Sequence, residues 1–164
     1  NRPNLDVDGR LVGKSDRFPL AAGSIPLVPE LAAPGREMPL LLDPANRDVD
    51  PIDHIQFQRV AGYWRPTPRR GSPLGQTTIE ILGLDRQSLL TLYNEHVESL
   101  QDALEHVESA GKSGDGARIL QEWRLRTSRW INRRRPFAGL SHDVFDHRFP
   151  QRFRAQWDLT LPRP

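Results

Sequence analysis

The first group of residues in this chain that could take part in metal binding or catalysis lies around His54. Asp43 and Asp53 bound an acidic loop in "PLLLDPANRDVDPIDHIQF" (39–57), and His54 follows directly. A histidine beside two carboxylates suits metal binding or general-base catalysis. The same residues suit a turn between strands, because Asp43 precedes Pro44 and a residue before proline is pushed to extended geometry. Taken alone, the residues favour the turn, with Asp43 and His54 as structural positions.

The remaining histidines offer a weaker signal. His96 and His106 stand ten residues apart on one predicted helix, so they lie on different faces. In "SHDVFDHRF" (141–149), His142 stands four residues before Asp146, and Asp143 stands four residues before His147. Two metal ligands on a helix can use this spacing. A polar helix face with its caps explains these pairs as well and is favoured. The chain contains no cysteine, so these residues alone cannot build a thiolate zinc site.

The carboxyl-terminal part of the chain is rich in arginine. Residues 111–164 carry 12 Lys/Arg against 5 Asp/Glu, a net charge of +7, whereas residues 1–110 carry 11 against 16, a net charge of −5. Arginine forks suit phosphates and carboxylates, and tryptophans between them can stack on bases. A solvated helix face with its tryptophans turned inward explains the same pattern, and both interpretations stay open. The candidate contacts with nucleic acid or a partner are Arg126, Arg129, Arg133, Arg134 and Arg135.

Two helices are predicted to position this cluster. The first runs from an N-cap at Asp85 to about residue 110, before Gly111, and the second covers about 116–134, before Pro136. Apolar residues recur on the first at alternating gaps of three and four, which is the pattern of a buried seam. A short loop between two such helices predicts an antiparallel helical hairpin over 85–134. The predicted seam consists of Leu90, Tyr93, Val97, Leu100, Leu104 and Val107, and the facing stripe of Leu120, Trp123, Thr127 and Trp130.

The amino-terminal part is predicted to be loop-rich with short strands around 39–65. A hairpin is expected around Asp8-Gly9, strands at 40–42 and 54–60, and a returning strand after a turn at Gly62. A short helical turn with a capping box from Thr77 to Glu80 follows, and Ser141 is expected to cap a third helix. The predicted fold class is therefore mainly α with a small β element, α+β. The chain is predicted to divide into a loop-rich part with short strands at 1–75, a helical domain at 76–150 and an extended tail at 151–164.

The chain has no apolar stretch near the roughly 20 residues that span a bilayer, which excludes a membrane-spanning helix. Its first residues, "NRPNLDVDGR", lack a signal peptide and an initiator methionine. The sequence is therefore interpreted as a fragment or a processed chain. The absence of cysteine is compatible with the cytoplasm, which is the expected location, as it is with any other compartment.

Four segments together resemble one family: "KSDRFPL" (14–20), "PLLLDPANRDVDPIDHIQF" (39–57), "GQTTIEILGLDRQSLL" (75–90) and "RRPFAGL" (134–140). They look like the part of the HNH endonucleases that follows the catalytic motif, in the retron-associated and Septu-type defence group (PtuB-like). The second and third segments are the most specific, because order and spacing match as well as composition. The resemblance covers about residues 1–140.

The resemblance implies a ββα-metal finger whose activating histidine, orienting asparagine and zinc-binding cysteines would lie upstream of residue 1. Asn1 matches the final, metal-side position of the finger. Lys14 matches a lysine displaced by an insertion, and Lys14 and Arg17 are further candidate contacts with nucleic acid or a partner. The full protein is then expected to use Mg²⁺ or Mn²⁺ and a structural Zn²⁺. Asp43 and His54 would be scaffold beside the finger.

The function implied by the resemblance is that of the nuclease subunit of a bacterial anti-phage system, hydrolysing DNA phosphodiesters with a metal ion. Its expected partners are DNA and an ATPase of the ABC/SMC-like kind (PtuA-like). The alternative is a non-enzymatic adaptor or nucleic-acid-binding module that uses the arginine-rich part. The residues without the resemblance favour this alternative.

Overall fold

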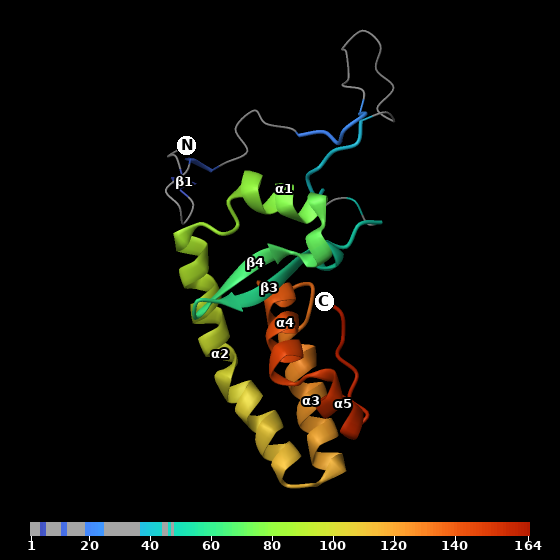
Figure 1. Ribbon diagram of the computed structural model, residues 1–164. Helices are drawn as coiled ribbons and strands as arrows, with labels where there is room; N and C mark the ends of the chain where they lie inside the picture. The colour runs from blue at the N-terminus through green and yellow to red at the C-terminus, as the bar shows by residue number, and fades with distance from the viewer. Residues whose placement is uncertain (1–3, 6–10, 13–18, 25–36, 44–45, 47) are drawn as a thin grey trace. The chain divides into compact units, whose positions relative to one another are not determined.

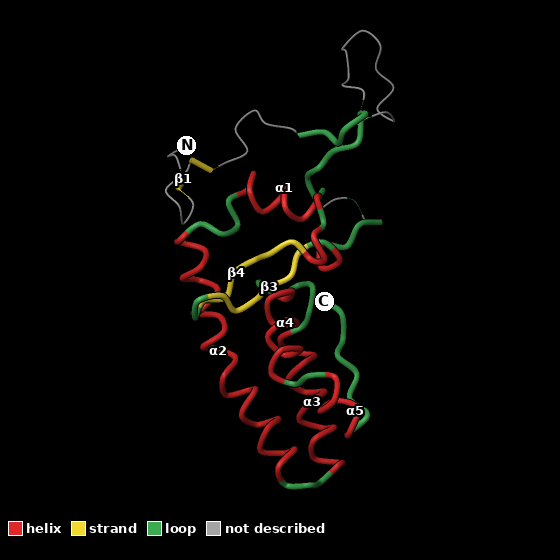
Figure 2. The backbone as a smooth tube through the Cα atoms, viewed as in Figure 1, coloured by secondary structure: helices red, strands yellow, loops and turns green. Residues whose placement is uncertain are grey.

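The chain is a mainly helical α+β protein, as the apolar periodicities predict. A computed structural model describes residues 4–5, 11–12, 19–24, 37–43, 46 and 48–164 (Figure 1). Helices dominate the carboxyl-terminal part, and the strands are short (Figure 2). The elements are β1 (Asn4–Leu5), β2 (Leu11–Val12), β3 (Ile55–Val60), β4 (Tyr63–Pro68), α1 (Pro73–Leu82), α2 (Gln87–Lys112), α3 (Gly116–Trp130), α4 (Ala138–Arg148) and α5 (Gln151–Gln156), with 3-10 turns at Pro51–Asp53 and Arg69–Gly71.

Two compact units make up the chain. The first consists of Asn1–Gln56 and Pro66–Leu89, and the second of Phe57–Arg65 and Leu90–Pro164. The units interleave in sequence, because the β3–β4 hairpin and α2 each contribute residues to both. The predicted three-part division of the chain stays a prediction.

The helical hairpin of α2 and α3 is confirmed, with boundaries a few residues from those expected. Helix α2 begins at Gln87 and runs through Gly111 to Lys112, so Gly111 does not end it. The amide of Ser113 still donates to Ser109 O over 3.1 Å, which extends the helical pattern past Gly111. The chain turns instead at Gly114, whose φ of +72° is a backbone angle that glycine adopts without strain.

The seam of α2 is buried as its spacing predicts. Leu100 and Val107 are fully buried, and the other four predicted positions are at most 8% exposed. Ala103 and Ala110 complete the buried face. Because these side chains recur every three or four residues, one continuous stripe of the helix leaves the solvent.

The α3 stripe is confirmed in its centre and differs at its ends. Trp123 and Thr127 are buried, whereas Leu120 and Trp130 are only partly covered, and Ile119 is the fully buried residue of the first turn. Asp115 is the N-cap of this helix. Its side chain accepts hydrogen bonds from Ala117 N over 3.0 Å and from Arg118 N over 3.1 Å. Such an N-cap satisfies donors that the first helical turn leaves without partners.

An aromatic cluster fills the second unit around Trp123. Its ring lies edge-on to those of Phe145 and Phe149, at centroid distances of 5.9 and 5.7 Å. All three side chains are at most 2% exposed. Edge-to-face pairs of this kind add about 0.5–1.5 kcal/mol each beyond the area they bury. Helix α4 is therefore a core element.

Helix α4 does not begin as expected. Its first residue is Ala138, and Phe137 precedes it in the left-handed region with a φ of +57°. Ser141, the expected cap, lies inside the helix and is fully buried. Its backbone amide donates to Phe137 O over 2.9 Å, as an interior helical residue does. The capping prediction for Ser141 is wrong because the buried hydroxyl has a partner on another helix, described below.

The expectation of an extended tail at 151–164 is wrong for its first part, because Gln151–Gln156 form α5 after Pro150. Residues 157–164 form neither helix nor strand but are anchored by specific contacts. Leu159 is 7% exposed, and the indole N–H of Trp123 donates to Thr160 O over 2.8 Å. An apolar contact and the need to satisfy a buried N–H therefore fix the tail on the helices.

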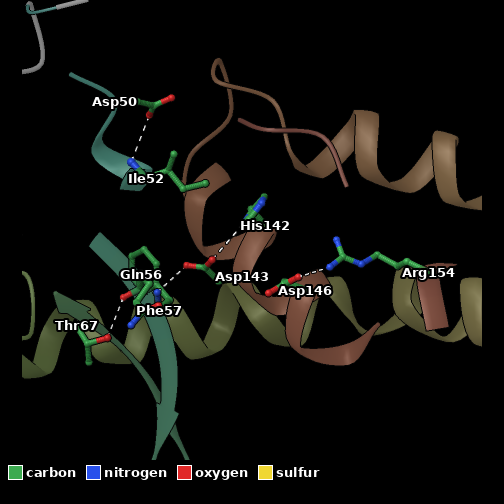
Figure 3. Close-up of polar contacts among 9 residues, drawn as sticks. All are labelled: Asp50, Ile52, Gln56, Phe57, Thr67, His142, Asp143, Asp146 and Arg154. Atoms are coloured by element: carbon green, nitrogen blue, oxygen red, sulfur yellow. Dashed lines mark hydrogen bonds and ion pairs between the residues drawn. The ribbon is translucent and has the colours of Figure 1, made fainter. Parts of the chain in front are cut away.

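The β3–β4 hairpin is confirmed, with its turn at Gly62 as predicted. Ala61 and Gly62 have φ values of +50° and +88°, the left-handed pair of a two-residue hairpin turn. In the second unit, Phe57 N donates to Asp143 Oδ2 over 2.7 Å (Figure 3), and Trp64 N donates to Asn94 Oδ1 over 3.4 Å. Helix side chains thus satisfy edge amides of both strands, which leaves these positions closed to further pairing.

In the first unit, β1 pairs antiparallel with β2, with Asn4 opposite Val12 and Leu5 opposite Leu11. The predicted turn of this hairpin, Asp8-Gly9, lies outside the described residues. The predicted strand at 40–42 is wrong, because residues 40–42 are not in a strand. The neighbouring Pro39 makes a single antiparallel bridge with Leu20.

Candidate functional site

The site around His54 begins with the acidic loop that precedes it. Asn46 N donates to Asp43 O over 3.1 Å. The residues between them, at which the turn is predicted, lie outside the described residues. The side chain of Asp50 then accepts from Ile52 N over 3.3 Å and starts the 3-10 turn Pro51–Asp53. Figure 3 shows the contact between Asp50 and Ile52. His54 follows this turn and directly precedes β3.

His54 is held on both its side chain and its backbone. Its ring Nδ1 lies 2.8 Å from Ser72 Oγ. Its carbonyl oxygen accepts from Arg69 N over 2.8 Å. Ser72 also caps α1, because its Oγ accepts from Gly75 N over 3.2 Å. The imidazole of His54 is therefore half-buried and tied to a helix cap. The assignment of His54 as scaffold stays a prediction.

Gly75 allows α1 to approach this histidine closely. A Cβ added at Gly75 would lie 2.0 Å from His54 O, a distance that no real contact allows. The absence of a side chain at this position is therefore a packing requirement, not a requirement for flexibility.

A second link joins the loop to the same helix. Thr78 is 3% exposed, and its Oγ1 accepts from Leu42 N over 2.9 Å. The predicted capping box from Thr77 to Glu80 is wrong. Ser72 followed by Pro73 caps the helix instead, since a proline in the first turn needs no acceptor for a backbone N–H. The Ser72–Pro73 pair is the sequence signal that was missed.

The arginine cluster lies in the second unit and divides into two kinds of residue. Arg126 pairs with Glu122 one helical turn away, with Nη2 3.0 Å from Oε2. Arg133 donates from Nε to Pro164 O over 2.7 Å. These two guanidinium groups are already engaged within the described part of the chain.

The other three arginines of the cluster are exposed. The Arg129 guanidinium lies 5.5 Å from the ring centroid of Trp130, within cation–π range. Arg134 and Arg135 lie in a turn after α3, where Asn132 accepts from both of their backbone amides over 3.0 and 2.8 Å. Helix α3 ends at Trp130, before Pro136, because this asparagine offers the backbone an alternative to the helix.

Arg118 and Arg124 are also exposed on α3 but were not among the predicted contacts. Their positions relative to the buried Ile119 and Trp123 place them on the solvent face of the helix, so the apolar stripe could have indicated them. Asn1, Lys14 and Arg17 lie outside the described residues.

His96 and Ser141 form a polar pair inside the second unit. Nε2 of His96 lies 2.8 Å from Ser141 Oγ, and the ring packs edge-on against Trp130 and Phe137. Burial lowers the pKa of His96 below its usual value of 6.5, because a desolvated ring resists protonation.

The His/Asp pairs of 141–149 are not joined at the predicted spacing of four. His142 instead contacts its neighbour Asp143 at 3.1 Å, while Asp146 binds Arg154 Nη2 at 2.6 Å (Figure 3). Asp143 is 8% exposed, and its second oxygen accepts from Phe57 N. Among the described residues, no group of three or more His, Cys, Asp or Glu is arranged to hold a metal ion.

None of the helices in the described ranges combines the length and the apolar character needed to cross a membrane. The comparisons with known proteins find no match to this chain among family models, curated proteins or solved structures.

Proposed function

We propose that this chain is the part of an HNH endonuclease that follows the catalytic motif, within the nuclease subunit of a bacterial anti-phage defence system of the retron or Septu type. The full protein would act in the cytoplasm with an ABC/SMC-like ATPase (PtuA-like). In this proposal the activating histidine lies outside the 164 residues, and Asn1 supplies a side-chain oxygen to Mg²⁺ or Mn²⁺, which prefer oxygen ligands. A structural Zn²⁺ is bound by cysteines elsewhere in the full protein.

The observation that carries the proposal is the way the two most specific segments of the resemblance meet. Residues 39–57 and 75–90 are joined by Leu42 N to Thr78 Oγ1 and by the close approach of Gly75 to His54 O. Segments that bind each other across such a distance in sequence behave as one scaffold. This supports the assignment of both to the frame of a nuclease domain and of His54 to that frame.

The proposal gives the exposed arginines the role of phosphate contacts. Arg129, Arg134 and Arg135 are exposed, and a guanidinium fork matches the geometry of a phosphate. Arg126, whose charge Glu122 already balances, should contribute less. The cluster would thus hold the DNA backbone without reading its sequence.

A plasmid-nicking assay tests the proposed activity. The full protein, purified with its ATPase, should convert supercoiled plasmid to the nicked form in Mg²⁺ or Mn²⁺, and chelation by EDTA should stop the reaction. DNA that stays intact with every metal, while the protein still binds it, would contradict the nuclease assignment.

DNA binding by the cluster is tested with an Arg129/Arg134/Arg135→Ala variant, which removes the three arginines to which the proposal gives phosphate contacts. Affinity should fall for all DNA sequences, and the slope of log K against log salt should flatten by about one unit for each phosphate that the variant no longer binds. Arg126→Ala is the matched control and should change the slope least. Unchanged DNA binding together with failure to associate with the ATPase would reassign the cluster to the protein interface.

The exposed arginines also favour a second candidate function, that of a non-enzymatic adaptor holding nucleic acid. The adaptor predicts salt-dependent DNA binding and no metal-dependent nicking by the full protein. The same two assays therefore separate it from the nuclease.

A further inference from the structure

A hollow of about 250 Å³ lies within the second unit, away from the arginine cluster. Its apolar lining comes from Trp64, Val97, Leu104 and Val144, all of which are at most 8% exposed. Three elements of the unit, the hairpin, α2 and α4, therefore contribute to one concave surface.

The polar lining of the hollow is cationic. It consists of Arg59 from β3, Gln101 from α2, and His147 and Arg148 from the last turn of α4. Among the described residues, no carboxylate belongs to the lining, and Glu108, which pairs with Nε of Arg148, lies outside it. Two guanidinium groups from different elements thus face a space with an apolar wall.

Arg59 is the residue that no other task explains. Its side chain is exposed and forms no hydrogen bond or ion pair with the described residues. Arg148 stands at the carboxyl end of α4, where the helix dipole stabilises a cation. That account does not extend to Arg59, which is on a strand.

We propose that this hollow is a phosphate-binding site that takes the phosphate of a nucleotide or of a nucleic-acid strand. Arginine binds phosphate through paired, charge-assisted hydrogen bonds. The amide of Gln101 and the ring of His147 supply further donors. The volume suits a phosphate ester with part of its sugar, since drug-sized ligands use about 300–1,000 Å³.

The proposed site is separate from the arginine cluster and from the nuclease proposal. The cluster lies around the turn before α4, whereas His147 and Arg148 end that helix. Loss of nicking would leave this site untouched, and failure of this site would leave the nicking assay unchanged.

Trp64 provides the reporter for the test. Its ring lies edge-on to His147 at a centroid distance of 5.6 Å, so a ligand that contacts His147 changes the environment of the indole. The experiment follows the indole N–H resonance of Trp64 by NMR in the full chain, assigned with a Trp64→Phe variant. Inorganic phosphate, adenosine monophosphate and a single-stranded oligonucleotide are titrated at constant ionic strength.

The expected result is a saturable shift of the Trp64 resonance with phosphate. Arg59→Ala should weaken binding about 10-fold or more, as expected for the loss of a hydrogen bond to a charged group. Arg59→Lys should restore part of it, because the charge returns without the fork. Arg124→Ala, an exposed arginine outside the lining, is the matched control and should bind as the unchanged protein does.

The three ligands also identify the source of the phosphate. Tighter binding of the oligonucleotide than of the mononucleotide points to a nucleic-acid strand, and equal binding points to a free nucleotide. No saturable shift with any of them, or the same affinity in Arg59→Ala as in the unchanged protein, would overturn the proposal.

Discussion

The corner around His54 in the first unit and the helical core of the second unit are held by different forces. At this corner, the side-chain oxygen of Ser72 contacts the ring of His54 and that of Thr78 accepts from Leu42 N. Gly75 allows α1 to approach the carbonyl oxygen of His54 closely. The core is instead a seam of apolar side chains around a cluster of aromatic rings. One region depends on a few specific polar contacts and the other on the total area that it buries.

This difference predicts how each region responds to substitution. A hydrogen bond adds about 0.5–1.5 kcal/mol net to stability, whereas a buried leucine side chain adds about 1.5–3 kcal/mol. The core should therefore show the largest losses on truncation. The corner should be sensitive mainly to changes of shape that block its close approach.

The largest effect is expected for Leu100→Ala in α2. Leu100 is fully buried, so the truncation should cost about 2–4 kcal/mol of unfolding free energy through reduced burial and a new cavity. Urea unfolding followed by tryptophan fluorescence measures this cost. Leu92→Ala on the same helix is the control, since Leu92 is 45% exposed and should change stability by about 0.5 kcal/mol or less. Equal costs for the two would remove the distinction between core and surface.

The next largest effect is expected for Gly75→Ala at the corner. The added methyl group would collide with His54 O, and the backbone shift needed to relieve it should cost about 1–3 kcal/mol. Gly139→Ala is the matched control, because a Cβ there meets no atom within 4 Å and alanine favours the helix. Thermal melting of the two variants should move in opposite directions, and a harmless Gly75→Ala would show that the corner is loosely packed.

A smaller loss is expected for Ser72→Ala, which removes both the cap of α1 and the partner of His54. The cost should be about 0.5–2 kcal/mol, the usual range for an N-cap serine. Urea unfolding measures the stability, and hydrogen exchange at Gly75 N locates the loss. Unchanged protection of that amide would contradict the assignment of Ser72 as the cap.

The smallest effect concerns pH and the core. The pKa of His96 is lowered in the folded protein, so the unfolded chain binds the extra proton as pH falls below 6.5. Stability from this residue is present above pH 6.5 and is lost as pH falls through the folded pKa. A His96→Gln variant should lose less stability than the unchanged protein between neutral and mildly acidic pH. Equal losses for both proteins would show that His96 does not titrate in this way.

The core was largely predictable from the sequence because its information is periodic. The α2 seam repeats every three or four residues, and burial follows from that spacing alone. The misplaced ends have local causes, such as the side chain of Asn132 ending α3 before Pro136. The helix at 151–156 was missed because so short a segment shows no period.

The corner could be predicted only in part. A turn before His54 follows from Asp43-Pro44, but the contact of His54 with Ser72 joins residues 18 positions apart and leaves no local pattern. The capping box at Thr77 fitted the sequence rule, yet Thr78 was already needed by Leu42 N. The hollow lined by Arg59 brings together three elements, and no single segment could have indicated it.

The HNH proposal is tested most directly by comparing His54→Ala with Asn1→Ala in the full protein, by plasmid nicking in Mg²⁺ or Mn²⁺ and by melting curves. We predict that His54→Ala lowers the melting temperature, by about 2–4 °C for each kcal/mol of stability removed, and that the variant still nicks DNA below that temperature. Asn1→Ala should abolish nicking at an unchanged melting temperature. If His54→Ala abolishes nicking without loss of stability while Asn1→Ala still nicks, His54 is catalytic and the alignment to the HNH pattern is wrong.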